Sequence, residues 1–373
     1  MQVRGSGLDL DTARKLAALR GSSQREIIEP PLKWSGRKAR PFYISPLREA
    51  YQRAGSPELV DPFMGAGTFG LNLAPGNKAL LSDFDPMLVR ALNAIKNKNM
   101  SIDWSKLKDE SGFITPQAFF EDLRGGVPRS RGGKFFTNVF PPKSGTLNDF
   151  LSRQGDLSPE EQLQATKLWM MYQNLATAGN PRMSGQGLAN NTFNWMPPGV
   201  SLEDTWDYSH YSPLMENFDI RHASAFDLLQ DESLIDPDNQ FATIDPPYLG
   251  EPGAYGPGGF SEADTERLAD ILGGLAERGM PIAAFNSRFA SPIFADRGFD
   301  VFHNLRTEKF RNKPFAVQKP EMVALANIDM DEDDWFRNFP ENRWAFDDLE
   351  PRQVAKSAQM TLDAFDQAWS LIR

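Results

Sequence analysis

The chain has 373 residues, a formal net charge of −10, no cysteine and only three histidines. This length can form one large domain or two smaller ones. The lack of cysteine excludes disulfides, thiolate zinc sites and any mechanism with a cysteine nucleophile. Because the histidines do not form a closely spaced ligand pair, we expect neither a structural nor a catalytic metal.

No segment approaches the roughly 20 consecutive apolar residues that a membrane-spanning helix needs. Residues 1–21 mix basic and acidic side chains without an apolar segment, which is not the pattern of a signal peptide. We therefore expect a protein of the reducing cytoplasm, without membrane contact.

The net negative charge argues against nucleic acid as a partner, but two segments are locally basic. Their basic residues are Arg124, Arg129, Arg131, Lys134 and Lys143 in the first segment, and Arg306, Lys309, Arg311, Lys313 and Lys319 in the second. Only Glu308 opposes them within these limits. Such patches can contact phosphates although the whole chain is acidic, and the alternative is that both are ordinary solvated loops.

In the first hundred residues, short apolar runs alternate with amphipathic segments. The pattern predicts strands and helices in the order typical of a parallel α/β sheet. The predicted helices cover residues 8–19, 46–53, 69–73 and 86–97, and the predicted strands cover residues 59–60 and 78–82.

Residues 104–212 interrupt this alternation with long polar loops and a helix over 158–177, which starts at a capping box of Ser158 and Glu161. Beyond the interruption the alternation resumes. Strands are predicted over residues 220–225, 241–244, 281–285 and 321–326, and a helix over residues 261–277. The tail from residue 329 is acidic but rich in aromatic side chains, so we expect it to pack on the core or on a partner.

The most informative motif is Asp245-Pro246-Pro247-Tyr248, which directly follows the predicted strand 241–244. It places a carboxylate at a strand end, beside two rigid prolines and an aromatic ring. The carboxylate and a proline carbonyl can accept the N–H bonds of an amino group on a flat ring, while the tyrosine covers the ring face. The motif therefore indicates a site for a planar amine.

A second motif follows the strand at residues 59–60. Gly65 and Gly67 flank a small residue at the entry to a helix, where glycine lets the backbone approach a ligand closely. The next strand ends at Asp83, a position from which acids bind ribose hydroxyls in nucleotide-binding sheets. Alone, the glycine pair is weak evidence and Asp83 could be a turn residue. Together with the Asp245 motif, the glycine pair and Asp83 are much more specific evidence than any one of the three alone.

Together with residues 33–38, these motifs resemble the Dam-type (alpha-group) adenine-specific DNA methyltransferases, which use S-adenosylmethionine. That family carries, in order, Lys-Trp-x-Gly-Gly-Lys, Asp-Pro-Phe-x-Gly-x-Gly, an inserted DNA-recognition region and Asp-Pro-Pro-Tyr. The corresponding segments here are residues 33–38, 61–67, 104–212 and 245–248. The resemblance covers about residues 28–328. It implies a Rossmann-like α/β methyltransferase sheet with an inserted, mainly helical target-recognition domain.

The resemblance divides the chain into four parts. They are an N-terminal extension (1–27), a catalytic methyltransferase domain (28–103 and 213–328), the target-recognition insert (104–212) and an acidic C-terminal extension (329–373).

Roles for individual residues also follow from the resemblance. Asp245 and the Pro246 carbonyl would hold the amino group of a flipped adenine on which Tyr248 stacks, and the methyl group would move by direct displacement. The catalytic set is Asp245, Pro246, Pro247 and Tyr248. The cofactor-binding set is Trp34, Lys38, Asp61, Phe63, Gly65, Gly67, Asp83, Phe226 and Asp227. The DNA-binding set is Arg129, Arg131, Lys134, Arg311 and Lys313.

Several alternatives stay open. Asp227 could be a helix-start acid, and Trp34 and Lys38 could be a packed tryptophan and a surface lysine. Arg37 replaces the second family glycine, and the recognition insert matches poorly, so a DNA sequence preference cannot be transferred. Methylation of the cytosine 4-amino group or of RNA adenine, and a non-catalytic DNA-binding role, are the competing functions.

We expect an enzyme of bacterial, phage or mobile-element origin that acts on double-stranded DNA. Restriction–modification, replication control and self-protection of a mobile element are all compatible with the sequence. The oligomeric state is not indicated.

Overall fold

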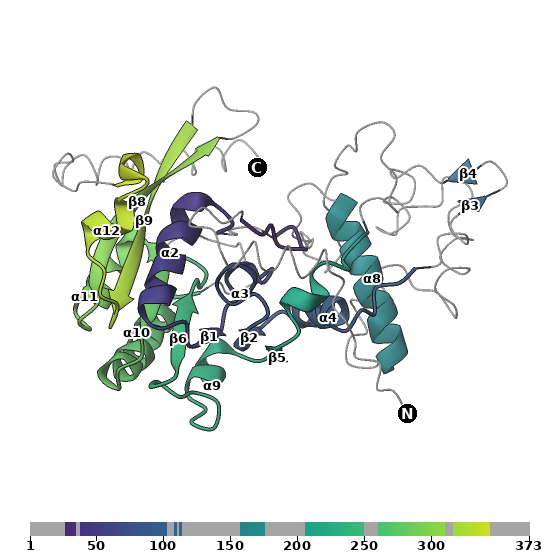
Figure 1. The fold of residues 1–373 in the computed structure, drawn as a ribbon, viewed down its shortest axis with the longest axis horizontal. Coiled ribbons are helices and arrows are strands. Elements are labelled where there is room, and N and C mark those ends of the chain that lie inside the picture. Colours follow the sequence, from purple (N-terminus) through teal and green to yellow (C-terminus); the bar gives the residue numbers. More distant parts are fainter. Residues whose placement is uncertain are drawn as a thin grey trace, which may run out of the picture.

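The computed structural model describes residues 27–34, 38–102, 108–109, 112–113, 157–175, 206–249, 260–309 and 316–343. At its centre lies a seven-stranded sheet with the strand order β5-β2-β1-β6-β7-β9-β8 (Figure 1). In chain order these strands are β1 (Glu58–Asp61), β2 (Ala79–Asp83), β5 (Phe218–His222), β6 (Gln240–Ile244), β7 (Ile282–Ser287), β8 (Asp300–Lys309) and β9 (Ala316–Ala326). Two further short strands, β3 (Lys108–Asp109) and β4 (Gly112–Phe113), form a separate antiparallel pair.

The direction of the strands defines the fold class. The five strands from β5 to β7 are parallel, and β9 runs antiparallel between β7 and β8. In chain order, the parallel strands follow the third-second-first-fourth-fifth arrangement of a doubly wound nucleotide-binding sheet. The sheet therefore confirms the predicted Rossmann-like α/β methyltransferase fold.

Side chains of the central strands alternate between two apolar cores, one on each face of the sheet. Leu59 and Phe241 belong to one core, whereas their neighbours Val60 and Ala242 belong to the other. Helices cover both faces, as a parallel sheet requires. The first face carries α2 (Pro41–Arg53), α3 (Thr68–Leu73) and α4 (Pro86–Lys96), and the second carries α9 (Ala225–Leu229), α10 (Glu262–Glu277) and α11 (Ser291–Ala295).

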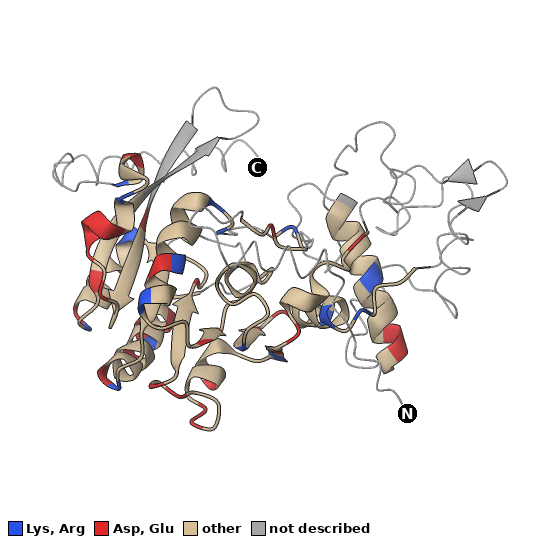
Figure 2. Cartoon of the chain, in the orientation of Figure 1, with Lys and Arg blue, Asp and Glu red and all other residues tan. Residues whose placement is uncertain are grey.

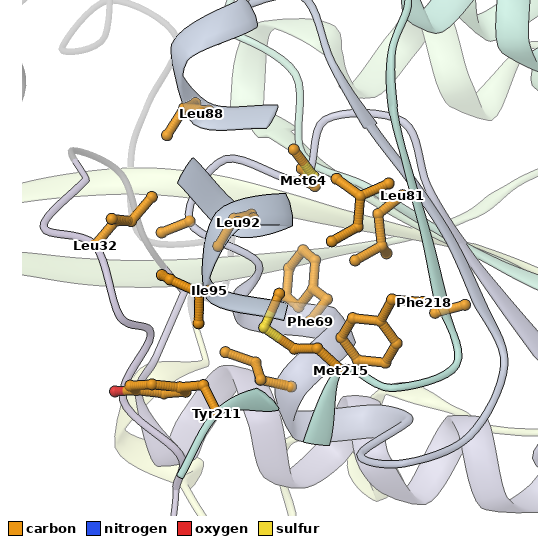
Figure 3. Packing of buried hydrophobic residues seen from close by; sticks show 14 of the residues in the cluster. Leu32, Met64, Phe69, Leu81, Leu88, Leu92, Ile95, Tyr211, Met215 and Phe218 are labelled. Atoms are coloured by element: carbon orange, nitrogen blue, oxygen red, sulfur yellow. The ribbon is translucent and has the colours of Figure 1, made fainter. Parts of the chain in front are cut away.

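The core on the first face is built around α3. Figure 3 shows Phe69 of α3 at the centre of this packing, next to Leu92, Met215 and Phe218. Met215 follows the short 3-10 helix η4 (Ser212–Leu214), which leads into β5. This packing fixes α3, and with it the loop between β1 and α3.

The helix α8 (Pro159–Leu175) lies along α4, at the opposite end of the sheet from the β8–β9 hairpin (Figure 1). Its first turn has the predicted capping box. The Glu161 N–H donates to Ser158 Oγ at 3.3 Å, and the Ser158 N–H donates to Glu161 Oε2 at 2.9 Å. The remainder of the predicted insert lies outside the described residues, apart from the β3–β4 pair and the segment that leads into η4.

Part of the C-terminal extension belongs to the folded core, as its aromatic content predicts. The side chains of Trp335 and Phe336 in α12 (Glu332–Phe336) are buried, and Trp335 lies 6.3 Å from the ring of Phe285. Arg53 of α2 pairs with Asp334 at 2.7 Å, and Figure 2 shows basic positions next to the acidic ones of α12. A 3-10 helix, η6 (Pro340–Asn342), follows.

Two predicted elements need correction. The strand expected over residues 220–225 ends at His222, because Ser224 caps α9 by accepting the Phe226 N–H at 3.2 Å. The strand β8 was not predicted at all. The predicted helix over residues 8–19 lies outside the described residues, as does the proposed boundary between residues 103 and 104. The division into four parts stays a prediction. Within the described part of the chain, no helix is long and apolar enough to cross a membrane.

Candidate active site

The two predicted motifs lie at the tips of neighbouring strands. β1 and β6 are adjacent and parallel, with Leu59 opposite Phe241 and Val60 opposite Ala242. The chain continues from β1 to β2 on one side and from β6 to β7 on the other. Ligands of open α/β sheets bind beyond the carboxyl ends of the strands at such a topological switch point. The glycine loop and the Asp245 motif therefore meet beyond the carboxyl ends of the central strands, as the sequence predicts. This end of the strands is called the site edge of the sheet below.

The loop after β1 requires glycine at two positions. Gly65 has a φ of +49° and Gly67 a φ of +78°, a left-handed backbone that costs other residues roughly 1–2 kcal/mol. A Cβ on Gly65 would also lie 3.1 Å from Cδ1 of Trp34. Trp34 is half-buried and covers this loop, so the structure brings the first and second motifs together.

Asp83, at the tip of β2, is tied to the glycine loop. Its Oδ2 accepts the Gly65 N–H at 2.9 Å, and its Oδ1 accepts the Asp85 N–H at 2.8 Å. Burial raises the pKa of the Asp83 carboxyl to about 6, although these N–H groups favour the charged form and oppose the shift. Asp83 thus lies at the predicted position and links two strand tips.

Asp61, the last residue of β1, is fully buried. Its Oδ1 accepts the Phe63 N–H at 3.2 Å, whereas its Oδ2 is buried without a hydrogen-bond partner. Burial raises the pKa of this carboxyl well above its ordinary value, and the negative charges of Asp245 and Asp83 add to the rise. Three carboxyl groups therefore converge at the site edge of the sheet, and one of them has an unused oxygen.

The Asp245 motif begins directly after β6, and hydrogen bonds to β7 anchor the chain that leaves it. The Leu249 N–H donates to Asn286 Oδ1 at 3.0 Å, and the Ser287 hydroxyl donates to the Leu249 carbonyl at 2.7 Å. Pro246 is buried, whereas Pro247 and Tyr248 are half-buried. The motif is thus held at both ends by parallel strands.

Lys38 contacts this motif. Its Nζ lies 3.0 Å from Oδ1 and 3.1 Å from Oδ2 of Asp245, and the side chain is only 3% exposed. The same Nζ lies 4.8 Å from the ring centroid of Tyr248, 5.3 Å from that of Tyr43 and 5.9 Å from that of Phe285. The alternative of a surface lysine is therefore wrong.

An aromatic cluster lies beside these carboxyl groups. The rings of Phe226 and Phe260 are stacked at 6.0 Å, and Phe63 meets Phe260 edge-on at 6.0 Å. The Arg267 guanidinium lies 4.3 Å from the Phe226 ring centroid. Phe226 and Phe63 thus come together as the predicted cofactor set requires. Asp227 is exposed in the first turn of α9, where its helix-start interpretation also fits.

Sequence reasoning missed several residues of the site edge. Phe84 follows Asp83 with a ring that is 78% exposed, and Phe260 joins two predicted phenylalanines. Tyr43 donates its hydroxyl proton to the buried Glu321 close to Lys38. The position of Phe84 directly after Asp83 could have indicated its place in the site, whereas nothing in the sequence indicates the positions of Tyr43 and Glu321. The predicted DNA-binding residues Arg129, Arg131, Lys134, Arg311 and Lys313 lie outside the described residues.

Comparison with known proteins decides the family. A family model for D12 class N6 adenine-specific DNA methyltransferases matches residues 45–312, well over half of the chain. The chain belongs to this family. The resemblance to Dam-type enzymes is thereby confirmed, and the family implies a DNA substrate and, in general, S-adenosylmethionine as methyl donor. The match begins after Trp34 and Lys38, so their roles do not follow from it.

Other comparisons add little to this D12 class methyltransferase. No curated protein matches it. Among solved structures, it is similar to precorrin 8w decarboxylase of Methanobacterium thermoautotrophicum, with 14% identity and a TM-score of 0.28. That alignment covers 76% of this chain and 89% of the other. A likeness of this strength supports no argument about the site.

Proposed function

We propose that the protein transfers the methyl group of S-adenosylmethionine to the 6-amino group of a flipped adenine in duplex DNA, by direct displacement. The observation that carries this proposal is the adjacency of β1 and β6, which puts the glycine loop and Asp245 at the same switch point. A donor held by the loop and an acceptor held by Asp245 can then meet across one crevice.

The residues at the strand tips fit S-adenosylmethionine, which supplies a methyl group activated by a positively charged sulfur. The unused Asp61 Oδ2 is a buried acceptor at the site edge, where a cationic ligand with an ammonium group would bind. Asp83 can accept hydroxyl donors with the remaining lone pairs of its carboxylate. Phe63, Phe226 and the exposed ring of Phe84 offer apolar surface for an aromatic ring.

The residues on the β6 side fit a planar amine. In the proposal, Asp245 and the Pro246 carbonyl accept the two N–H bonds and turn the nitrogen lone pair toward the methyl group. Tyr248 stacks on the base, which must leave the duplex because its amino group cannot be reached inside it. The methyl–sulfur bond breaks as the methyl–nitrogen bond forms, and the methylated amino group then loses one proton, to Asp245 or to solvent. An ordinary carboxylate is a modest base, so the main role of Asp245 is to orient the amino group, and the acceleration comes from positioning and electrostatics.

The β8–β9 hairpin supports duplex DNA as the substrate. β7 ends at Ser287, opposite Glu321, but β8 and β9 stay paired as far as Lys309 and Ala316. The hairpin therefore extends beyond the carboxyl ends of the parallel strands, on the edge that carries Asp245. Its sequence is the second basic segment, whose positive charge favours phosphate contacts.

The proposal can be tested with the purified protein, labelled S-adenosylmethionine and unmethylated plasmid DNA. We expect labelled 6-methyladenine after digestion to nucleosides, and loss of transfer in Asp245→Ala with binding of S-adenosylhomocysteine retained. Labelled 4-methylcytosine, or transfer to RNA alone, would move the function to one of the alternatives. Lack of cofactor binding in the wild type would favour a non-catalytic DNA-binding role. Sequencing of the modified DNA then gives the recognition site.

A further inference from the structure

Lys38 occupies the part of the site that the proposed function reserves for the target base. Its Nζ is almost equidistant from the two oxygens of Asp245, at 3.0 and 3.1 Å, so both oxygens accept from the same ammonium group. The Nζ also lies over the ring of Tyr248, 4.8 Å from the centroid. These are the two contacts, with a carboxylate and with a ring face, that the amino group and ring of a flipped adenine would make.

An ammonium group and an exocyclic amino group compete for such a position, because both present N–H donors to the same oxygens. The Lys38 ammonium group lies against both oxygens of Asp245 and over the Tyr248 ring, so a base stacked on the same ring face would bring its amino group into the space that Nζ occupies. The Lys38 side chain is 3% exposed and that of Asp245 is 18% exposed, so the position is largely closed to solvent. A target amino group that approaches Asp245 from the Tyr248 side therefore has to displace Lys38.

We propose that Lys38 is a placeholder for the target amino group: it holds Asp245 while the site is empty and leaves it when a base enters. This inference rests on the proposed function. It explains why a lysine is buried here, because a half-buried carboxylate without a cation beside two other acids would be destabilising. The ion pair keeps the empty site stable and has to be broken for each productive binding event.

The surroundings of Lys38 give the displaced ammonium group a second place to bind. Its Nζ already lies 5.3 Å from the ring centroid of Tyr43 and 5.9 Å from that of Phe285. Both distances are within the range of cation–π attraction. The buried carboxylate of Glu321 lies next to Tyr43, whose hydroxyl donates to it. A small shift of the side chain can therefore free Asp245 without exposing Lys38 to water.

The inference makes a specific prediction about binding. A duplex with adenine at the target position has to displace Lys38, whereas the same duplex with an abasic target leaves the slot to Lys38. Removal of the lysine amine should therefore favour the adenine duplex over the abasic one. We expect the ratio of the adenine Kd to the abasic Kd to fall about tenfold in Lys38→Met, which corresponds to about 1.4 kcal/mol.

The experiment measures these two dissociation constants by fluorescence anisotropy, in the presence of S-adenosylhomocysteine, with duplexes that carry the site found by sequencing. Lys78→Met is the matched control, because Lys78 is an exposed lysine directly before β2, at the amino ends of the parallel strands and away from the site. We expect its ratio to equal that of the wild type. Lys38→Arg, which keeps a cation, should also stay close to the wild type.

A ratio that is unchanged or higher in Lys38→Met would overturn the inference, because Lys38 would then have a general structural role or would help to bind the base. Lys38→Leu, which also lacks an N–H donor, gives the same test should the methionine variant fail to bind S-adenosylhomocysteine. The methylation assay on the wild type separates failure of the placeholder role from failure of the proposed function. If the wild type methylates DNA but the ratio does not move, only the placeholder role fails. If the wild type transfers no methyl group, the proposed function fails with it.

Discussion

Asp83 gives the sharpest test of the electrostatics at the strand tips, because its ionisation can be measured without any ligand. Burial raises the pKa of its carboxyl from the ordinary 3.8 to about 6 in the folded protein. The folded state therefore binds this proton more tightly than the unfolded state does. The resulting stabilisation is fully present below pH 3.8 and is lost as the pH rises through 6.

The size of this stabilisation follows from the difference between the pKa values of Asp83 in the folded and unfolded states. One pKa unit corresponds to about 1.4 kcal/mol, so a shift of about two units sets an upper limit of about 3 kcal/mol. Asp83 is partly accessible to solvent, which screens its charge, and we therefore expect about 1–3 kcal/mol. In Asp83→Asn this pH-dependent contribution is absent.

The assay is urea unfolding of the wild type and of Asp83→Asn at a series of pH values from 4 to 7. The asparagine amide faces backbone N–H groups that now donate to the carboxylate, so the variant should be less stable by an offset that is constant with pH. The stability advantage of the wild type should shrink by about 1–3 kcal/mol as the pH rises. Asp219→Asn, which removes an exposed acid of β5, controls for the lost charge.

A wild-type advantage that stays constant, or grows, between pH 4 and 7 would refute this reasoning. It would mean that the N–H donors and the solvent stabilise the charged form of Asp83 enough to cancel the effect of burial. The pH dependence of the Asp219→Asn variant must follow that of the wild type for the comparison to hold.

Three further predictions concern other parts of the molecule. Gly65→Ala and Gly67→Ala should each destabilise the protein by about 1–2 kcal/mol through their positive φ, but only the former, whose Cβ would press on a tryptophan ring, should weaken S-adenosylhomocysteine binding in calorimetry. Equal losses of affinity would contradict this. Replacement of Arg311 and Lys313 by glutamate should reduce the slope of log K for DNA against log salt by about 2, and an unchanged slope would remove both residues from the interface. Trp335→Ala should cost about 3–5 kcal/mol in urea unfolding because the ring is buried, whereas a loss below about 1 kcal/mol would mean that α12 is not part of the core.

The parallel half of the sheet could be predicted because its local signals agree with its tertiary role. Short apolar runs such as 241–244 became fully buried strands, and the capping box at Ser158 formed as expected. The edge strand β8 gave no comparable signal. It pairs with β9 and, through one isolated bridge from Asn304, with Arg343. Its sequence includes Asp300, His303 and Asn304 among the apolar residues, so the alternation that marks a half-buried strand is weak.

The motifs of the site could likewise be found, but not the contacts between them. The order of the glycine loop, Asp83 and Asp245 along the chain predicts that they share an edge, because parallel strands present their carboxyl ends together. Lys38 and Asp245 are 207 positions apart, and their ion pair depends on the path of the segment before α2. No spacing rule encodes such a contact, so the sequence does not predict that Lys38 pairs with Asp245.

The carboxyl groups of Asp61, Asp83 and Asp245 are stabilised in three different ways in the free protein, and these differences bear on their functions. Asp245 is paired with a buried lysine, Asp83 accepts two backbone N–H groups, and burial of Asp61 favours its neutral form. Lys38 is a side chain with rotatable bonds, whereas the backbone donors of Asp83 cannot move away without unfolding of the loop. An incoming amino group can therefore exchange with Lys38 more easily than with the donors of Asp83. The fixed environments of Asp61 and Asp83 instead suit a ligand that adds to contacts already present, as a tightly held cofactor does.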